Sequence, residues 1–158
     1  MTILQWMIVV LPCVIVGCGK SQSTLHREAI LRVYRADGEL ASRRKAALVN
    51  AATVADEANL IGEYCRGLEL LDMSDCPSDF AMAYRQHVRA WRAGEAVVRQ
   101  FPDGFWEGAA IGLWNAAANS EWDGGLTRMQ AEQVQALKKI NETYEEVERI
   151  GAKYEAMP

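Results

Sequence analysis

The sequence has few of the residues on which most catalytic and metal-binding sites depend. It contains only 2 histidines, His26 and His87, and neither lies in an H-E-x-x-H, E-x-x-H or C-x-x-C-H motif. Zinc, di-iron and c-type haem sites therefore have no support in the sequence. The motifs C-x-x-C and G-x-S-x-G and a glycine-rich phosphate loop are also missing, so redox, serine-hydrolase and phosphate-binding chemistry lack their usual signals. We expect no metal, no cofactor and no catalytic residue.

An excess of basic charge is missing as well. The 158 residues include 17 Lys and Arg against 21 Asp and Glu, which gives a net charge of −4 and an isoelectric point of about 5.3. Because general nucleic-acid binders are strongly basic, we expect no nucleic-acid partner. The hydrophobic share of 50% and the charged share of 24% are typical of a folded chain, and the length fits one domain.

The first 17 residues contain no charged side chain. Within them, residues 6–16 form an apolar run of the length found in the hydrophobic region of a signal peptide. A helix that crosses a bilayer needs about 20 apolar residues, so this run is too short to span one. We therefore predict a signal peptide rather than a transmembrane helix.

The run ends in Ile15-Val16-Gly17-Cys18, which resembles the lipobox of bacterial lipoproteins. The resemblance implies cleavage before Cys18 and attachment of membrane lipid to its sulfur. It also implies a place on the periplasmic face of a bacterial membrane, and Gly19 at the next position favours the outer membrane in a Gram-negative cell. The acyl chains of a mature lipoprotein give stable attachment. The alternative is an ordinary signal peptide that is cleaved further on, with Cys18 an incidental thiol.

The rest of the chain predicts helices. Residues 18–158 contain 23 alanines, the strongest helix former, and no alternating strand pattern. Pro77 and Pro102 divide the chain into three helical blocks. We predict an all-α fold, an antiparallel three- or four-helix bundle over residues 23–158, after a signal peptide at 1–17 and an anchor and short tether at 18–22.

Apolar residues recur at steps of three and four in each block, the spacing of one helix face. The seam of the first block, about residues 23–71, consists of Ala51, Val54, Ala58, Ile61, Cys65 and Leu68. The seam of the second block, which ends near residue 100, consists of Phe80, Tyr84, His87, Trp91 and Val98. The seam of the last helix, about residues 126–154, consists of Leu137, Ile140, Tyr144, Val147, Gly151 and Tyr154. In the first block we expect a break at Asp37-Gly38, with one long helix as the alternative.

Two cysteines, Cys65 and Cys76, flank the loop between the first two blocks. The periplasm is oxidising, and a disulfide there would clamp the helical hairpin and stabilise it by about 3 kcal/mol. The loop would have to double back to bring the two Cα atoms within about 7 Å. We predict this disulfide, with two buried free thiols as the alternative.

Three glycines, Gly104, Gly108 and Gly112, are spaced four residues apart in the nearly uncharged stretch 105–118, beside Trp106 and Trp114. Small residues on one helix face allow close helix contact, so this ridge is a candidate interface for self-association or membrane contact. The alternative is a helix packed inside the bundle.

Residues 20–45 carry seven basic and three acidic side chains. Arg43, Arg44 and Lys45 end this stretch and are a candidate surface for an anionic lipid or an acidic envelope polymer. The alternatives are a solvated helix face and pairing with the acidic parts of the chain.

The predicted function is that of a lipid-anchored, non-catalytic interaction or scaffold module of the bacterial cell envelope, whose partner is an envelope protein or a second copy. The alternative is a bundle that binds a small apolar ligand, or acts as an enzyme on one, in an aromatic pocket. Tyr84, His87 and Trp91 are the candidate pocket residues, because they share one helix face.

Overall fold

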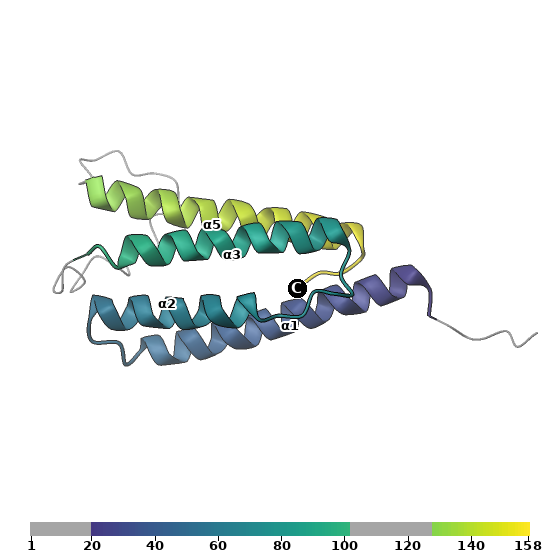
Figure 1. Ribbon diagram of the computed structural model, residues 1–158, viewed down its shortest axis with the longest axis horizontal. Helices are drawn as coiled ribbons and strands as arrows, with labels where there is room; N and C mark the ends of the chain where they lie inside the picture. Colours follow the sequence, from purple (N-terminus) through teal and green to yellow (C-terminus); the bar gives the residue numbers. More distant parts are fainter. Residues whose placement is uncertain (1–19, 102–127) are drawn as a thin grey trace, which may run out of the picture.

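The computed structural model describes residues 20–101 and 128–158, and these residues form four helices and no strand. The helices are α1 (Gln22–Leu48), α2 (Val54–Glu69), α3 (Ser78–Val98) and α5 (Arg128–Lys153). Each runs antiparallel to the one before it, with α2 against α1, α3 against α2 and α5 against α3 (Figure 1). The predicted all-α antiparallel bundle is therefore confirmed for the part of the chain that the structure describes.

The predicted seams face the core. Five of the six residues predicted for the first seam, Val54, Ala58, Ile61, Cys65 and Leu68, are buried on α2. All five residues predicted for the second seam are buried on α3. In the last seam, Ile140, Val147 and Gly151 of α5 are buried, whereas Leu137 and Tyr144 of α5 and Tyr154, just after it, are partly buried. The core is therefore built as the helical periodicity predicts.

The predicted break at Asp37-Gly38 is wrong, because α1 continues through both residues to Leu48. A glycine inside a helix costs only about 1 kcal/mol relative to alanine. Packing outweighs that cost, because Ile30 and Val33 before Gly38 are 0% and 2% exposed and Leu40 and Ala41 after it pack against the core. The helix ends at Leu48, and residues 49–53 connect it to α2. Ala51 therefore lies in this connection rather than on the seam.

A capping box fixes the start of α2. The Thr53 hydroxyl accepts a 3.0 Å hydrogen bond from the backbone N–H of Asp56. In return the Asp56 carboxylate accepts a 3.0 Å hydrogen bond from the backbone N–H of Thr53. Together they satisfy donors that a helix start otherwise leaves unpaired, which is why the chain turns at this point.

The disulfide predicted between Cys65 and Cys76 is absent from the structure, in which both residues are free thiols. Cys65 is 0% exposed in the core of α2. It lies four residues before Glu69, the last residue of the helix, and is therefore about 6 Å below that end along the axis. Cys76 is half-buried at the far end of the following loop. Cys65 thus lies in the core and Cys76 at its edge, each as a free thiol.

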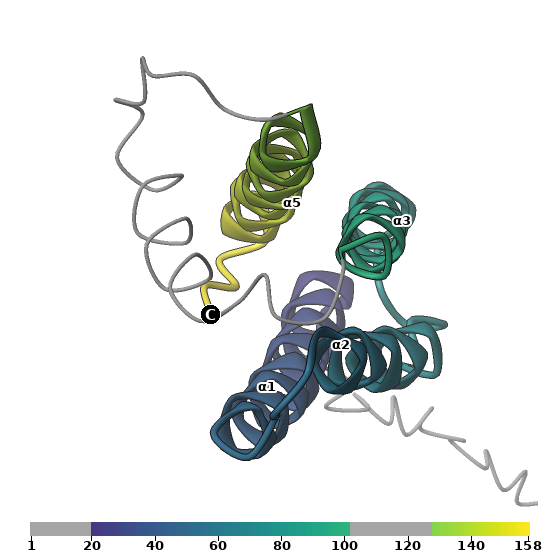
Figure 2. The ribbon, with the colours of Figure 1, turned by 90° about the vertical axis from the view of Figure 1, so that its left-hand side faces the viewer.

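The side of the bundle between α1 and α5 is closed only in part. Near the start of α1, His26 makes an edge-to-face contact with Tyr154, at 5.8 Å between ring centroids. About two turns further along α1, the Tyr34 hydroxyl donates a 3.1 Å hydrogen bond to the carbonyl of Val147. Beyond these contacts α1 and α5 lie apart, as the view along the bundle shows (Figure 2).

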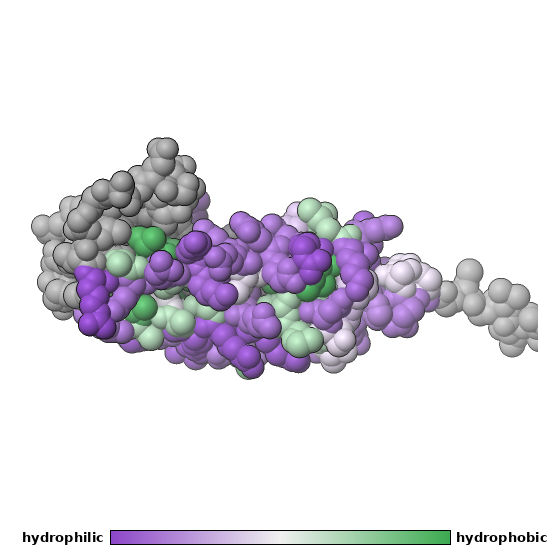
Figure 3. All heavy atoms as spheres, turned by 90° about the horizontal axis from the view of Figure 1, so that it is seen from above, coloured by the Kyte–Doolittle hydropathy of each residue, from purple (hydrophilic) through white to green (hydrophobic). Residues whose placement is uncertain are grey.

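The outer surface is largely charged. Seen from the α5 side, hydrophilic residues cover most of the molecule, and hydrophobic residues form small separate patches (Figure 3). On the exposed face of α5 the Arg149 guanidinium pairs with Glu146 at 2.6 Å. In the described ranges, no helix has the length and apolar character needed to cross a membrane.

Candidate functional site

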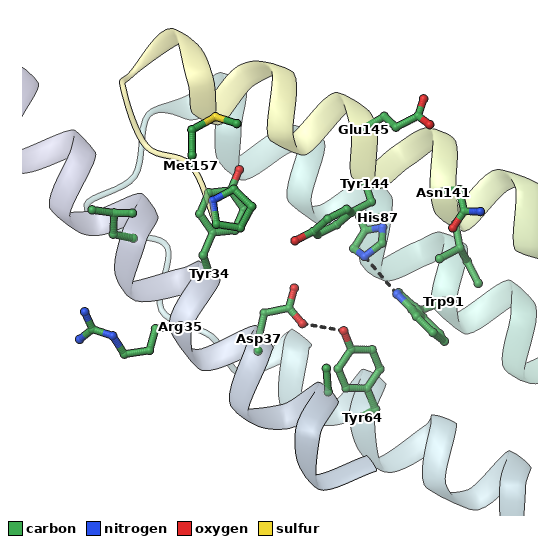
Figure 4. A pocket seen from close by; sticks show the side chains of 15 residues that line it. Tyr34, Arg35, Asp37, Tyr64, His87, Trp91, Asn141, Tyr144, Glu145 and Met157 are labelled. Atoms are coloured by element: carbon green, nitrogen blue, oxygen red, sulfur yellow. Dashed lines mark hydrogen bonds between the residues drawn. The ribbon is translucent and has the colours of Figure 1, made fainter. Parts of the chain in front are cut away.

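A cleft of about 770 Å³ opens between α1 and α5, with side chains of α2 and α3 at its base (Figure 4). Its aromatic lining comes from all four helices: Tyr34 from α1, Tyr64 from α2, His87 and Trp91 from α3, and Tyr144 from α5. Asp37 is the acidic group among these rings, and two exposed charges, Arg35 and Glu145, stand at the rim. The cleft is thus a mostly apolar cavity in which aromatic rings surround a few polar groups.

Asp37 lies on the inward face of α1 and is 6% exposed. The hydroxyl of Tyr64 donates a 2.6 Å hydrogen bond to its Oδ1 atom. This hydrogen bond joins α1 to α2 through a buried charge, and such bonds are about twice as strong as those between neutral groups. Burial raises the pKa of Tyr64, and the charge of Asp37 raises it further, so the phenol keeps its proton.

The hydrogen bonds of His87 with Trp91 and Thr143 suit the neutral form of its ring. The indole N–H of Trp91 can only donate, and it lies 3.0 Å from Nε2 of His87, which must therefore accept. The proton of the neutral ring is then on Nδ1, 3.1 Å from the hydroxyl oxygen of Thr143. The Thr143 hydroxyl in turn lies 2.9 Å from the carbonyls of Lys139 and Ile140.

Burial lowers the pKa of His87, which is 3% exposed. Both ring nitrogens are engaged with Trp91 and Thr143. The ring therefore has no free position for a metal or for proton transfer, although one edge of it lines the cleft. The described residues also contain no group of three or more His, Cys, Asp or Glu side chains placed to hold a metal ion.

The three candidate pocket residues are only partly brought together at the cleft. His87 and Trp91 line it, as the sequence predicted. Tyr84 does not, because it is 0% exposed beneath them and its ring stacks on Phe80 at 6.0 Å. Burial raises the pKa of Tyr84, and the nearby charge of Asp37 adds to that effect. Tyr84 is thus a core residue that supports the base of the site.

The basic cluster of α1 does not form one surface. Arg44 turns inward and lies over two aromatic rings, with its guanidinium carbon 4.5 Å from the centroid of Trp91 and 5.1 Å from that of Tyr64. Arg43 pairs loosely with Glu39 at 3.6 Å, and Lys45 is exposed. Arg44 therefore belongs to the aromatic cluster behind the cleft, whereas its two neighbours face solvent.

Gly38 leaves the mouth of the cleft open. It lines the cleft in the middle of α1, and a Cβ atom placed on it would meet nothing within 4 Å. No close approach of another element requires a glycine here, and glycine weakens a helix. The helix thus loses some stability at a position where a side chain would narrow the opening.

Several predicted site residues lie outside the described residues. They are the lipidation candidate Cys18 and the interface candidates Gly104, Gly108, Gly112, Trp106 and Trp114. The structure therefore leaves the lipid anchor and the glycine ridge as predictions of the sequence.

Four residues of the cleft were not predicted from the sequence as site residues: Tyr34, Asp37, Tyr64 and Tyr144. One signal was available, because Tyr34, Asp37, Ala41 and Arg44 recur at steps of three and four and so share a helix face. An acidic residue in the middle of such a face has to be buried or bound. Comparison with models of protein families, with curated proteins and with solved structures finds no match for this chain.

Proposed function

We propose that this chain is a non-catalytic binding module that holds a small, largely apolar ligand in the cleft between α1 and α5. The observation that carries the proposal is the cleft itself, about 770 Å³ in volume and lined by aromatic rings from four helices. Ligand sites in proteins commonly have 300–1,000 Å³ and combine apolar walls with a few polar groups. The predicted aromatic pocket, at first the alternative to a scaffold, is therefore the function that the geometry favours.

A binding role fits the polar groups of the cleft better than catalysis does. Both nitrogens of His87 are engaged, and the pKa of the ring is lowered by burial. The core thiol, Cys65, is buried, and burial raises its pKa to about 11, so it is a poor nucleophile at neutral pH. Neither group is poised for proton transfer or nucleophilic attack.

The test uses an uncharged fluorescent dye, N-phenylnaphthylamine, whose emission rises in apolar sites. Wild type and Gly38→Ala should bind it alike, since alanine adds one methyl group into open space. Gly38→Trp should weaken binding about tenfold or more, because an indole at this position enters the cleft. Equal binding by all three proteins would place the dye elsewhere and overturn the proposal.

We further propose that a lipid on Cys18 holds this module at a bacterial membrane, on the periplasmic side. The supporting feature is the lipobox resemblance, together with the start of α1 at Gln22, only four residues after Cys18. So short a tether would keep the domain close to the bilayer surface. Intact mass of membrane-extracted protein should show a chain that begins at Cys18 with a diacylglyceryl group. An unprocessed mass in wild type, identical in form to that of Cys18→Ala, would contradict the anchor.

A scaffold role through Gly104, Gly108 and Gly112 is compatible with ligand binding and would use a different part of the chain. Deleting residues 104–118 should change the oligomeric state or the co-purifying partners if this ridge is an interface. No change in either would contradict that role.

A further inference from the structure

We infer that the ligand of the cleft is an organic cation, such as a quaternary or substituted ammonium, held by the carboxylate of Asp37 between tyrosine rings. This inference rests on the proposed binding function and adds the charge of the ligand to it. Three observations support it: the charge balance around Asp37, the arrangement of the rings and the orientation of the hydrogen-bond donors.

The buried carboxylate of Asp37 forms no direct ion pair, although the half-buried Arg44 of the same helix interacts with it electrostatically at longer range. Among residues 20–101 and 128–158, no Lys, Arg or His nitrogen lies within 4.0 Å of its carboxylate, although eleven ion pairs of that kind form elsewhere. The remaining segments, 1–19 and 102–127, contain no Lys, Arg or His at all. No basic side chain outside the described residues is therefore available to neutralise it.

A buried carboxylate without a direct counter-charge is costly unless it is hydrogen-bonded. The 2.6 Å bond from Tyr64 satisfies one of its two oxygens, and the buried Tyr84 phenol also lies near the carboxylate, since a hydrogen bond to Asp37 contributes to its raised pKa. Figure 4 shows the other oxygen directed into the cleft, toward the side chain of Tyr144. A bound cation would supply the missing charge at this point.

The rings around this oxygen are suited to a cation. Tyr34 and Tyr144 stand on the two sides of the cleft near Asp37 (Figure 4). The negative faces of aromatic rings attract organic cations, and aromatic cages are the usual sites for quaternary ammonium groups. Burial raises the pKa of both tyrosines, so they remain uncharged phenols. The guanidinium of Arg44 over Trp91 shows the same preference at the back of the cluster.

Anionic ligands find few donors in the cleft. The Tyr34 and Tyr64 hydroxyls donate to Val147 and Asp37, and the proton of His87 points to Thr143. Arg35 is exposed, and Figure 4 shows its guanidinium pointing away from the cavity. Asn141 and Tyr144 also line the cleft and carry donors, but these groups are neutral, so they would offset the repulsion between an anion and the Asp37 carboxylate only in part.

The test compares choline with its carbon isostere, in which a quaternary carbon replaces the nitrogen, in the wild-type protein. Both molecules have the same shape, so a difference in affinity measures the charge. Calorimetry should show choline binding about tenfold or more tighter than the isostere. Equal affinities would overturn the inference and leave a neutral binding cleft, which the dye experiment reports independently. If neither choline nor the dye binds, both this inference and the proposed binding function are wrong.

Two variants with the same change of charge locate the effect. Asp37→Asn keeps the shape and an acceptor for Tyr64, and it should abolish the preference for choline. Glu145→Gln removes the exposed carboxylate at the rim and should leave the preference intact. A preference that survives in Asp37→Asn, or that is lost in Glu145→Gln, would place the cation elsewhere. The wild-type comparison stands even if Asp37→Asn does not fold.

Discussion

The hydroxyl of Tyr64, on α2, donates a 2.6 Å hydrogen bond to the carboxylate of Asp37, on α1, in the interior of the bundle. Asp37 is the acidic side chain buried in the core of the described residues, at 6% exposure. The same hydrogen bond therefore has two consequences, since it helps to hold α1 against α2 and it orients the carboxylate in the cleft.

Tyr64→Phe should lower the free energy of unfolding by about 2 kcal/mol, because a hydrogen bond to a buried charge is lost. Tyr34→Phe is the matched control, since its hydroxyl donates to a neutral carbonyl at 3.1 Å and its loss should cost about 1 kcal/mol. Urea unfolding of the three proteins measures both differences. A Tyr64→Phe protein no less stable than Tyr34→Phe would show that the charge of Asp37 is compensated in another way.

Two helical glycines should respond to alanine in opposite directions. Gly38→Ala should stabilise the chain by about 0.5–1 kcal/mol, because its Cβ meets nothing and alanine restricts the unfolded chain. Gly151→Ala should destabilise it by more than that, because its Cβ would overlap the Tyr34 hydroxyl and lie 2.8 Å from the backbone oxygen of Ala156. Midpoints of urea unfolding decide the question, and a shift of the same sign in both variants would contradict the geometry.

The helical seams were predictable because they depend on local spacing. Residues three and four apart share a face in any helix, so the burial of Ile61 and Leu68 on α2 and of Tyr84 and Trp91 on α3 follows from the sequence alone. The sequence predicted a break in α1 at Gly38 because the low helix propensity of glycine takes no account of the tertiary packing around it. The Thr53 capping box was the local signal that marked the true boundary.

The cleft was predictable only in part because its walls come from helices far apart in the chain. His87 and Trp91 were found since they lie on one helix face, one turn apart. Tyr64 and Tyr144 meet Asp37 only through tertiary packing, which helix propensity and spacing do not specify. The free state of Cys65 and Cys76 is likewise a feature of the tertiary structure that residue spacing does not specify.

The two free thiols should differ in reactivity. Burial raises the pKa of Cys65 to about 11 and also raises that of Cys76, but Cys76 is partly accessible and Cys65 is not. Iodoacetamide at about pH 8 should therefore modify Cys76 at least roughly tenfold faster than Cys65 in the native protein, and both equally in urea. Peptide mass mapping assigns the sites. Equal native rates, or recovery of both cysteines in one disulfide-linked peptide, would contradict the structure.

Acidification should weaken the fold through His87. Burial lowers the pKa of this residue in the folded chain, whereas in the unfolded chain it titrates near its ordinary value of about 6.5. Below that pH His87 is protonated in the unfolded chain but stays neutral in the folded chain. The free energy of unfolding then falls with falling pH, by at most about 1.4 kcal/mol per pH unit, and is constant well above the ordinary pKa.

Comparison with His87→Gln isolates this contribution. Between about pH 7.5 and 5.5 the wild type should lose more stability than the variant. Glu57 is present in both proteins and acts in the opposite direction, because burial raises its pKa, so that protonation favours the folded chain. Urea unfolding at the two pH values gives the difference between the slopes. Parallel slopes would mean that His87 is protonated in the folded chain as easily as in the unfolded chain. The assignment of a neutral ring bonded to Trp91 and Thr143 would then be incorrect.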